Sequence, residues 1–548
     1  MSEYRWLNDA SLQFLQNGYL LPNQTVDERV TIIAEYAENI LKIPGFADKF
    51  KSYVKKGWFS LSTPIWANFG TNRGLGISCF GSYISDTMES ILATHAEVAM
   101  MTKYGGGTSA YFGNLRPRGS PITNNGTSSG AVHFMRLFDN MINVVGQGST
   151  RRGNFAAYLP IDHPDIEEFL TLRTEGNPIQ DISFGVCVPE GWMQSMIDGD
   201  EAKRKIWAKI IQLRINTGYP YIFFGDNTNN NTVEVYKDNK LTITHSNLCQ
   251  EICLPDNDSM SFICCLMSMN VAYYDEWKDT DAVETAVYFL DSVIEDFIRR
   301  AHNLPYMKRA VKFAREHRAL GLGWLGWHTL LQSKMIPFES MEAKTLTGEI
   351  AKLIKEKAYT ASGNLAKIYG APELLRKYGR RNSTLLAIAP TKSSSFILGQ
   401  VSEGIEPIRS NYYIKDLQKG KFTTKNKHLQ EILAKYNKDT DEVWESIMRK
   451  HGSVQHLDFL SKREKDVFKT FPEISQMEVV IQASIRQKYI DQGQSLNLMI
   501  HPKTSPKDIN TLMIEAWKLG IKGLYYQIGV NAAQEFSKNI LSCSSCEA

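Results

Sequence analysis

Apolar residues recur every three or four positions in the first part of the chain, most clearly in DERVTIIAEYAENILKI, residues 27–43. This spacing places apolar side chains on one face of a helix, so we predict a helical N-terminal region over residues 1–60. From Leu61 the pattern changes to short β-rich runs interrupted by glycine, such as GISCFGSYI and GQGSTRRGNFAAYLPI. Strands and functional loops are expected to begin there.

Farther along, helical and strand-like patterns alternate. IWAKIIQLRINTG and TAVYFLDSVIEDFIRRA have helical spacing, whereas STLLAIAP and KGLYYQIG have the composition of strands. This alternation predicts the α/β class. Residues 413–462 are rich in Lys and Asp, and we expect them to form an exposed insertion.

Composition excludes several classes of protein. The apolar fraction is 43% and the charged fraction 22%, as in ordinary folded proteins, and a net charge of +3 provides no basic stripe for nucleic acid. The N-terminus has no signal-peptide pattern, and the longest apolar runs are too short to cross a membrane. We therefore predict a soluble, cytoplasmic protein. Its 8 cysteines are too few for a disulfide scaffold, so they are expected to be buried, metal-binding or catalytic.

The segment SNLCQEI combines a thiol with an amide and a carboxylate. If the segment is extended, alternate side chains share a face, so Asn247, Cys249 and Glu251 point the same way. Such a trio suits a site where sulfur acts on a substrate, Glu accepts a proton and Asn holds a hydroxyl. An edge strand with a buried cysteine is the alternative.

Two further cysteines, Cys79 in GISCFGSYI and Cys264 in FICCLMSMN, lie in apolar, β-rich runs. Each taken alone would be an inert core thiol. A reaction that draws two electrons from the protein needs a dithiol, and a buried dithiol needs an external reductant. The C-terminal LSCSSCEA carries Cys543 and Cys546, which could supply it.

In this order, these motifs resemble the large, catalytic subunit of class I ribonucleotide reductase, from about Leu61 to the C-terminus. The resemblance implies a ten-stranded α/β barrel of two half-barrels with a central finger loop. It implies that Cys249 forms a transient thiyl radical, that Asn247 and Glu251 are its polar partners, and that Cys79 and Cys264 are the redox pair. Cys253 and Cys265 are additional thiols, so Cys264 and Cys265 both remain candidates for the partner of Cys79.

RNSTLLAIAPTKSSS resembles the family's phosphate-binding stretch. Hydroxyls and backbone N–H groups at a helix start can hold a diphosphate, although the same residues could form a simple N-cap. Thr63 and Ser78 match positions around the substrate. The implied substrate-binding residues of the stretch are Pro390, Thr391, Lys392, Ser393, Ser394 and Ser395.

GLYYQ resembles the tyrosine pair that carries the radical inward, here Tyr525 and Tyr526. Adjacent residues of a regular strand point to opposite faces, so a radical path through these rings needs a local bend or offset stacking. A tyrosine pair favours class I over the cobalamin-dependent class, which generates its radical beside the substrate. The cobalamin-dependent reductase and a catalytically silent nucleotide-binding homologue remain the alternatives.

Two glycine-rich stretches match loops that sense the effector nucleotide in the family. Asp86 matches a contact to the effector's sugar, and Arg116 and Arg151 are candidates for effector or substrate contacts. GLGWLG, residues 321–326, fits a dinucleotide fingerprint, but a helix-like basic run precedes it instead of a strand. We interpret it as a site of close packing.

The tail explains why a cysteine pair lies at the chain end. Thiol exchange requires direct sulfur attack, so a reductant protein too large for the barrel needs an intermediary. The chain from Val530 to Cys543 reaches about 20 Å as a flexible coil and about 45 Å when stretched. Half of a zinc site is the alternative, although no other ligands are spaced to complete it.

The resemblance also implies the division of the chain and its partners. We expect a helical region at 1–60, a catalytic barrel at 61–530 and a redox-active tail at 531–548. The implied partners are a metal-containing, radical-generating small subunit, thioredoxin or glutaredoxin, nucleoside diphosphates, nucleotide effectors and a second copy of the chain, with no cofactor or metal bound in this chain. Because the substrate motif begins by Thr63, we expect no N-terminal ATP cone and no dATP inhibition through this chain.

Overall fold

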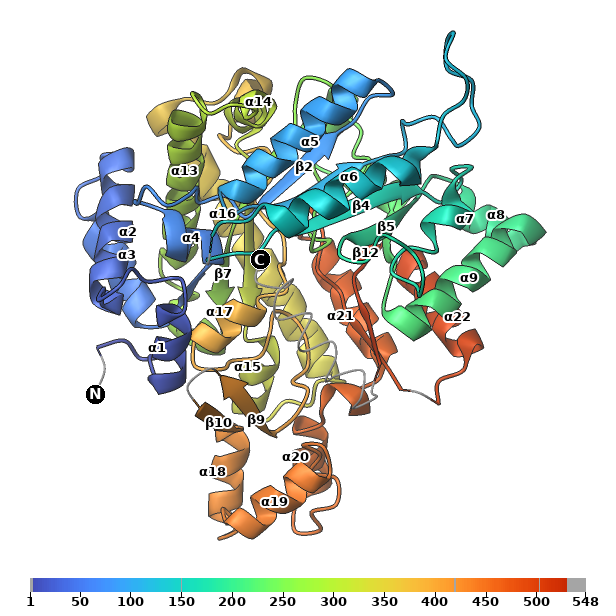
Figure 1. The fold of residues 1–548 in the computed structure, drawn as a ribbon. Coiled ribbons are helices and arrows are strands. Elements are labelled where there is room, and N and C mark those ends of the chain that lie inside the picture. Colours follow the sequence, from blue (N-terminus) through green and yellow to red (C-terminus); the bar gives the residue numbers. More distant parts are fainter. Residues whose placement is uncertain (1–2, 149, 418–419, 502, 530–548) are drawn as a thin grey trace.

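The computed structural model of the protein describes residues 3–148, 150–417, 420–501 and 503–529 (Figure 1). Its first part is helical, as predicted, with α1 (Asp9–Gln16), α2 (Val26–Leu41) and α3 (Phe46–Lys55). The Thr25 hydroxyl accepts a hydrogen bond from the Glu28 amide and the Glu28 carboxylate accepts one from the Thr25 amide, which caps α2. Phe50 of α3 stacks on Phe289 with ring centroids 4.2 Å apart, and this contact holds the helices against the barrel.

The first half of the barrel is a parallel sheet whose strands follow chain order. Its strands are β2 (Cys79–Tyr83), β3 (Gly107–Tyr111), β4 (Phe155–Pro160), β5 (Ser183–Val188) and β6 (Tyr221–Phe224). Figure 1 shows α5 and α6 lying across one face of this sheet. The helices in this part are α4 (Thr63–Asn68), α5 (Met88–Lys103), α6 (Ala131–Val144), α7 (Ile166–Phe169), α8 (Trp192–Asp198), α9 (Glu201–Thr217), α10 (Gly225–Asn230) and α11 (Glu234–Asp238).

The second half begins with β7 (Phe262–Asn270), which pairs in parallel with β8 (Leu320–Leu325). Single parallel bridges continue the ring, from Leu322 to Leu386 and from Ile388 to Gln494. Parallel pairing resumes between β11 (Leu498–Ile500) and β13 (Gln527–Gly529).

Two antiparallel junctions close the ring. β2 pairs with β7 at one junction, and β6 pairs with β12 (Gly523–Leu524) at the other. Two parallel halves that meet antiparallel confirm the predicted α/β barrel. β1 (Phe59–Leu61) adds an outer antiparallel strand to β7.

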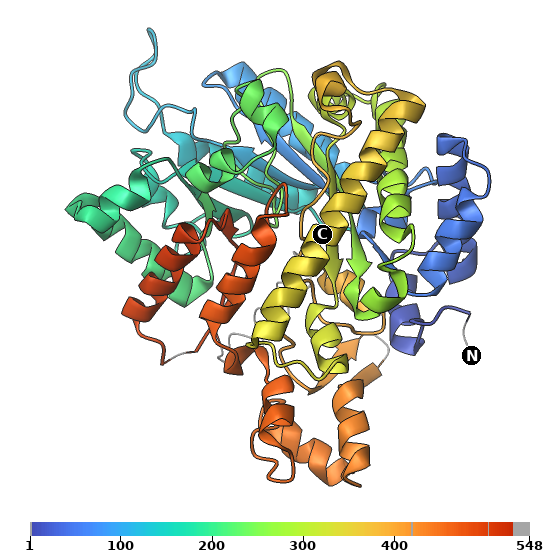
Figure 2. The same cartoon turned by 180° about the vertical axis from the view of Figure 1, so that it is seen from behind.

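Helices surround the second half as well. Figure 2 shows α16 as a long diagonal helix, and its contacts with α13 and α21 hold the back of the barrel together. Within the described ranges, every helix is too short or too polar to span a lipid bilayer. The helices of this half are η1 (Val271–Tyr273), α12 (Tyr274–Trp277), α13 (Ala282–Ala301), α14 (Lys308–His317), α15 (Trp327–Ser333), α16 (Met341–Tyr369), η2 (Glu373–Tyr378), α17 (Lys392–Ile397), α21 (Gln476–Gln487) and α22 (Pro506–Lys518).

The predicted insertion forms a small lobe that projects from the barrel at the bottom of Figure 1. Apolar residues of this lobe, including Leu433, Trp444 and Phe468, form a hydrophobic cluster of their own, so the segment is more than a solvated loop. Its elements are β9 (Tyr412–Leu417), β10 (Gly420–Lys425), α18 (Lys427–Lys435), α19 (Asp441–Arg449), α20 (Lys462–Val467) and η3 (Phe471–Glu473).

The GLGWLG stretch packs closely, as predicted. It forms β8 itself, and Gly326 precedes α15. A Cβ atom at Gly323 would lie 2.4 Å from the Ala387 carbonyl oxygen. A Cβ atom at Gly321 would lie 2.4 Å from a Leu266 methyl group and 3.0 Å from the Cys264 sulfur. These glycines let neighbouring strands approach, and one of them makes room for a candidate redox thiol.

Candidate active site

The antiparallel junction between β2 and β7 places Cys79 directly opposite Cys264. Opposed residues of an antiparallel pair have Cα atoms about 4.5–5.5 Å apart, which is within the range that a disulfide spans. Cys265 points to the other face of β7, where its thiol donates to the Leu290 carbonyl of α13 at 3.5 Å. The register therefore separates the two alternatives that the sequence left open and places Cys264 opposite Cys79.

The candidate finger loop enters the barrel between α11 and β7, without regular secondary structure, and residues 245–256 are all buried. The segment is a loop and not the edge strand of the alternative, but it is not extended throughout, because the chain turns at Gln250. Gln250 has a φ of 68°, and the Asn247 side-chain oxygen accepts hydrogen bonds from the amides of Glu251 and Ile252, both at 3.1 Å. The Asn247 side chain thus replaces a strand partner and closes the turn.

This turn directs two of the three expected side chains at Cys79. The Asn247 amide donates to the Cys79 sulfur at 3.1 Å, and the Cys79 thiol lies 4.0 Å from a Glu251 carboxylate oxygen. Ser495 links the third member, Cys249, to Glu251. Its hydroxyl lies 2.6 Å from the Cys249 carbonyl oxygen and 3.3 Å from the Glu251 carboxylate, and both oxygen atoms accept from it. Four of the predicted residues, Asn247, Cys249, Glu251 and Cys79, therefore belong to one buried cluster.

Burial sets the protonation of the cluster. Loss of solvation raises the pKa of Glu251 to about 7, against hydrogen bonds from Asn247 and Ser495 that favour the carboxylate. The pKa of Cys79 lies well above its usual value, first because of burial and then because of the nearby Glu251 and Cys264. Burial and the neighbouring Cys265 raise the pKa of Cys264 in the same direction. Both sulfur atoms are therefore neutral thiols at pH 7.

Three polar side chains that support this cluster were missed in the sequence. Gln492 accepts from the Cys253 amide at 3.0 Å, and its own amide donates to the Cys264 sulfur at 3.8 Å and to the Leu320 carbonyl at 3.0 Å. The Tyr158 hydroxyl donates to the Asn247 carbonyl at 2.6 Å. Together with Ser495, these residues belong to no spaced motif. Tyr158 lies in the apolar run FAAYLP, whereas Gln492 and Ser495 lie in the polar segment DQGQS, which has the composition of a loop. Neither local sequence indicates a contact with the cysteine cluster.

The expected substrate residues approach the cluster from the side of β1 and α4. Ser78 precedes Cys79 and donates to the Ser62 hydroxyl at 3.1 Å, and Ser62 precedes Thr63. The Ser394 hydroxyl reaches the Leu61 carbonyl at 3.5 Å. Residues from three distant parts of the sequence therefore gather next to Cys79.

The PTKSSS stretch forms a helix start, as predicted. Thr391 has a φ of 52° and precedes α17, and its hydroxyl accepts from the Gly404 amide at 2.8 Å. The first amides of any helix have no partner within that helix, so they are available to an anion. Lys392 adds a positive charge, which favours the ionised form of the buried Glu406. Pro390 leads into the turn, and Ser393 and Ser395 are buried in the short helix.

Tyr525 and Tyr526 lie between β12 and β13, outside regular strand structure, so their side chains are not held to opposite faces of one strand. Their ring centroids lie 4.3 Å apart at an angle of 52°. Tyr525 is buried, whereas Tyr526 is half-buried. The buried Arg214 of α9 donates to the Tyr525 carbonyl at 2.9 Å, which fixes the backbone at this bend.

The effector candidates occupy two places. Arg116 binds Asp86 through its backbone amide at 3.1 Å and its side chain at 2.7 Å, just before α5. Arg151 is buried beyond the other end of α5, where it donates to the Gly105 carbonyl at 2.7 Å and favours the ionised form of Cys79. A helix the length of α5 is about 24 Å long. Arg151 therefore lies near the cysteine cluster, whereas Asp86 and Arg116 lie at the opposite end of α5.

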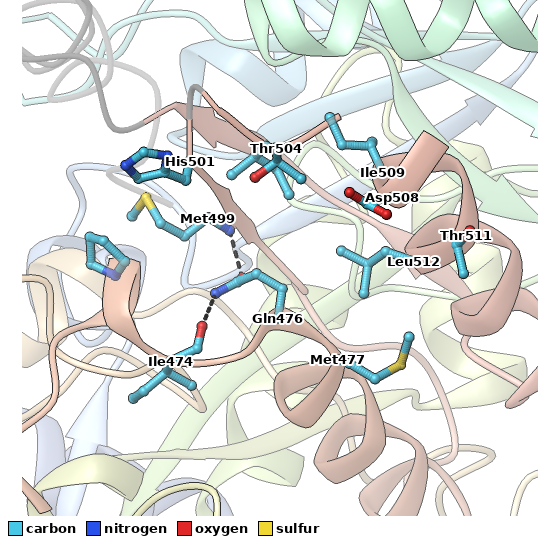
Figure 3. A pocket seen from close by; sticks show the side chains of 12 residues that line it. Ile474, Gln476, Met477, Met499, His501, Thr504, Asp508, Ile509, Thr511 and Leu512 are labelled. Carbon is cyan, nitrogen blue, oxygen red and sulfur yellow. Dashed lines mark hydrogen bonds between the residues drawn. The ribbon is translucent and has the colours of Figure 1, made fainter. Parts of the chain in front are cut away.

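A surface pocket of about 380 Å³ lies elsewhere, between α21, β11 and α22 (Figure 3). Met477, Met499 and Leu512 contribute apolar side chains, and Asp508 and His501 contribute polar ones. None of the predicted site residues lines this pocket. The predicted redox pair Cys543 and Cys546 lies outside the described residues.

The fold is an α/β barrel whose buried thiols Cys79 and Cys264 meet at the junction of its two halves, an arrangement suited to redox chemistry. The family described as "Ribonucleotide reductase, barrel domain" matches residues 77–203, 200–374 and 370–527. The chain therefore belongs to the ribonucleotide reductase family, as a large subunit that reduces ribonucleoside diphosphates to 2′-deoxyribonucleoside diphosphates together with a small subunit.

Individual relatives agree with this assignment. The chain is 33% identical to the ribonucleoside-diphosphate reductase large subunit of Invertebrate iridescent virus 3, over 94% of this chain and 92% of that protein. It is 38% identical to the candidate large subunit of Frog virus 3 (isolate Goorha), over 88% of each. Among solved structures it resembles the Actinobacillus ureae class Id ribonucleotide reductase alpha subunit, with 53% identity, 99% coverage of both chains and a TM-score of 0.92.

Proposed function

We propose that the cluster around Cys79 is where the ribose is reduced, with Cys249 as the radical-bearing thiol and Cys79 and Cys264 as the dithiol. The observation that carries this proposal is the pairing of Cys79 with Cys264 across the junction of the two half-barrels. The turn of the finger loop directs Asn247 and Glu251 at the same sulfur. Thr63, Ser78 and residues 390–395 then hold the substrate, with its diphosphate at the start of α17.

The reaction begins when a Cys249 thiyl radical takes the hydrogen atom from the 3′ carbon, so an S–H bond forms and a carbon radical remains. Glu251 accepts the proton of the 3′-hydroxyl. A carboxylate whose pKa lies near 7 is suited to this task, because half of it is ionised at neutral pH while it remains a useful base. Asn247 holds the hydroxyl in place.

The 2′-hydroxyl leaves as water with a proton from the dithiol. Cys79 and Cys264 supply two electrons and two protons in all, and an S–S bond forms between them. One proton leaves in the water, and one hydrogen atom bonds to the 2′ carbon. The second electron and the proton returned by Glu251 restore the 3′-hydroxyl on a 3′ carbon radical. Cys249 returns its hydrogen atom to the 3′ carbon and becomes a thiyl again. Burial suits Cys79 and Cys264 to this role, because raised pKa values keep both sulfur atoms protonated until the substrate reacts.

The radical reaches Cys249 through Tyr526 and Tyr525 from a metal-containing small subunit. The close, tilted contact of their rings between β12 and β13 supports this route. We further propose that Cys543 and Cys546 reduce the Cys79–Cys264 disulfide and are themselves reduced by thioredoxin or glutaredoxin. In the sequence, the tail follows β13 (Gln527–Gly529), which itself follows the tyrosine pair.

Effector control and dimerisation also belong to the proposal. The ion pair of Asp86 and Arg116 lies at the start of α5, and apolar side chains are exposed on α5 and α6. Leu92 is 52% exposed and Val144 is 85% exposed. A second copy of the chain would cover this apolar surface and place an effector between subunits. Leu92→Asp should then shift the sedimentation of the effector-loaded chain to that of a monomer.

Cytidine diphosphate reduction by this chain with a class I small subunit tests the proposal. Cys249→Ser and Tyr526→Phe should each abolish product, whereas the wild-type chain should form deoxycytidine diphosphate. Activity that persists in Cys249→Ser would refute the role of that thiol. Turnover with adenosylcobalamin and no small subunit would instead identify the cobalamin-dependent class.

A further inference from the structure

A third phenol joins the tyrosine pair. The Tyr219 hydroxyl lies 3.1 Å from the Tyr526 hydroxyl, and their ring centroids are 5.2 Å apart at 79°. Tyr219 follows α9 and is 307 positions away from Tyr526 in the sequence. This contact joins the two half-barrels at their second junction, where β6 meets β12.

The surroundings of Tyr219 fix its hydroxyl. Its ring stacks on Phe184 with centroids 5.4 Å apart and an interplanar angle of 9°. Ser183 places its hydroxyl 3.3 Å from that of Tyr219, and the Arg173 guanidinium covers the ring at 4.9 Å from its centroid. Only 8% of the Tyr219 surface is exposed. The phenol cannot turn away from Tyr526 without breaking these contacts.

We propose that Tyr219 is a third redox-active tyrosine, which exchanges a hydrogen atom with Tyr526. This inference rests on the proposed radical route through Tyr526. In the exchange the O–H bond of one phenol breaks and that of the other forms, while the electron and the proton move together. The tyrosyl radical changes place, no net charge develops, and no further oxidant or base is needed.

Geometry and chemistry both favour this step. The two oxygen atoms are within hydrogen-bonding distance, so the proton moves along an existing hydrogen bond. The reactants and products are the same pair of groups, a phenol and a phenoxyl, so their intrinsic energies match. The radical on Tyr526 is then shared with Tyr219 before it passes to Tyr525.

Replacement of single tyrosines by 3-aminotyrosine tests this inference, because aminotyrosine is oxidised more easily and traps a passing radical. The variants place it at Tyr526, at Tyr219 and, as a control, at Tyr236, a buried tyrosine outside the group whose hydroxyl is bonded to Ser383 at 2.8 Å. Each full-length chain is mixed with the small subunit, cytidine diphosphate and effector. Electron paramagnetic resonance then measures the aminotyrosyl radical.

We expect a trapped radical at positions 526 and 219 and none at 236. Trapping at 526 without trapping at 219 would overturn the inference and leave the proposed route intact. Absence of trapping at 526 would overturn both.

A second measurement leaves residue 219 free of added bulk. With aminotyrosine at position 526, the radical spectrum should contain a proton coupling that is present in water and lost in deuterated water. Tyr219→Phe should remove this exchangeable coupling. Tyr236→Phe should leave that coupling unchanged. An identical coupling in the Tyr219→Phe chain would show that the hydrogen bond does not exist during turnover.

Discussion

At the scale of single residues, burial decides what Glu251 can do. Its carboxylate is fully enclosed, and two hydrogen bonds do not restore the solvation that it loses. Its pKa of about 7 makes it a base that ionises at neutral pH. The raised pKa also implies that ionisation of Glu251 destabilises the folded chain, because the buried carboxylate is poorly solvated.

The activity of Glu251 should follow its ionisation. The base form predominates above about pH 7, so the pH profile of kcat/KM should fall on the acid side of pH 7. Glu251→Gln removes the base, and we expect turnover to decrease by about 10²- to 10⁴-fold and the acid limb to disappear. A steady-state profile from pH 5.5 to 9 measures both effects. A variant that retains the wild-type limb would assign that ionisation to another group.

The contribution of Glu251 to the free energy of unfolding should fall as pH rises, whereas its activity as a base should increase. The pKa of Glu251 is higher in the folded chain than the value of 4.5 expected when the chain is unfolded, so its contribution to stability is complete below pH 4.5 and is lost as pH rises to about 7. Glu251→Gln cannot ionise. Relative to wild type, the free energy of unfolding of the Glu251→Gln variant should increase by about 3 kcal/mol between pH 4.5 and pH 8. Equal changes in both chains, measured by urea unfolding, would contradict the assigned pKa.

Gly321 is a second single residue on which the site depends, because it leaves room for the Cys264 side chain. Gly321→Ala would place a methyl group 3.0 Å from the Cys264 sulfur and 2.4 Å from Leu266. We expect a loss of about 1–3 kcal/mol in unfolding free energy and slower oxidation of the dithiol. Gly363→Ala is the matched control, because its nearest neighbour would be 3.5 Å away in a helix. Oxidation rates that are equal in both variants would show that β8 does not constrain Cys264.

At the scale of elements, the junction of β2 with β7 positions the dithiol. The residues of β7 alternate between its faces, so Cys264 meets Cys79 whereas Cys265 meets α13. Periodicity alone could not choose between them, because both thiols are buried and the choice depends on the register of a strand 185 positions away (264 − 79).

This alternation gives a paired prediction. Cys264→Ser should abolish repeated turnover with thioredoxin as the reductant, whereas Cys265→Ser should keep at least half of the wild-type rate. Both changes replace a buried thiol by a hydroxyl, so a general packing defect would affect both. Product formation assays measure the difference, and the opposite order would mean that the strands pair in another register.

The finger loop shows where the sequence was insufficient. The residue types of SNLCQEI indicated the chemistry, but the turn depends on a positive φ at Gln250 and on a side-chain acceptor at Asn247. No glycine or proline marked this turn, so the sequence indicated an extended loop without the turn inside it. Tyr525 and Tyr526 posed the reverse case, because the chemistry required a ring contact that a regular strand would prevent, and the structure places both residues between strands.

At the scale of the whole molecule, the order of motifs predicted the barrel and the family. Alternating patterns indicated the α/β class, and motifs far apart in the sequence could meet only in a closed structure. Individual contacts between residues on different sides of the barrel could not be recognised from the sequence. Ser495 bonds to a residue 246 positions away and Tyr219 to one 307 positions away, and neither position differs from an ordinary polar or aromatic residue in its local sequence.

Under the proposed mechanism, one turnover stops the enzyme until a reductant arrives. Cys79 and Cys264 are enclosed where the two halves of the barrel meet, so a protein-sized reductant could not directly contact a disulfide formed between them. The chain must therefore be able to perform one reduction with its own thiols before any external electron donor acts.

A single-turnover experiment tests this claim most directly. The fully reduced chain is mixed with the small subunit, effector and cytidine diphosphate in the absence of thioredoxin, and the chain carries Cys543→Ser and Cys546→Ser so that the tail cannot contribute. We predict about one deoxycytidine diphosphate per active site together with a Cys79–Cys264 disulfide in the peptide map. Product formed while both thiols remain reduced would contradict the account.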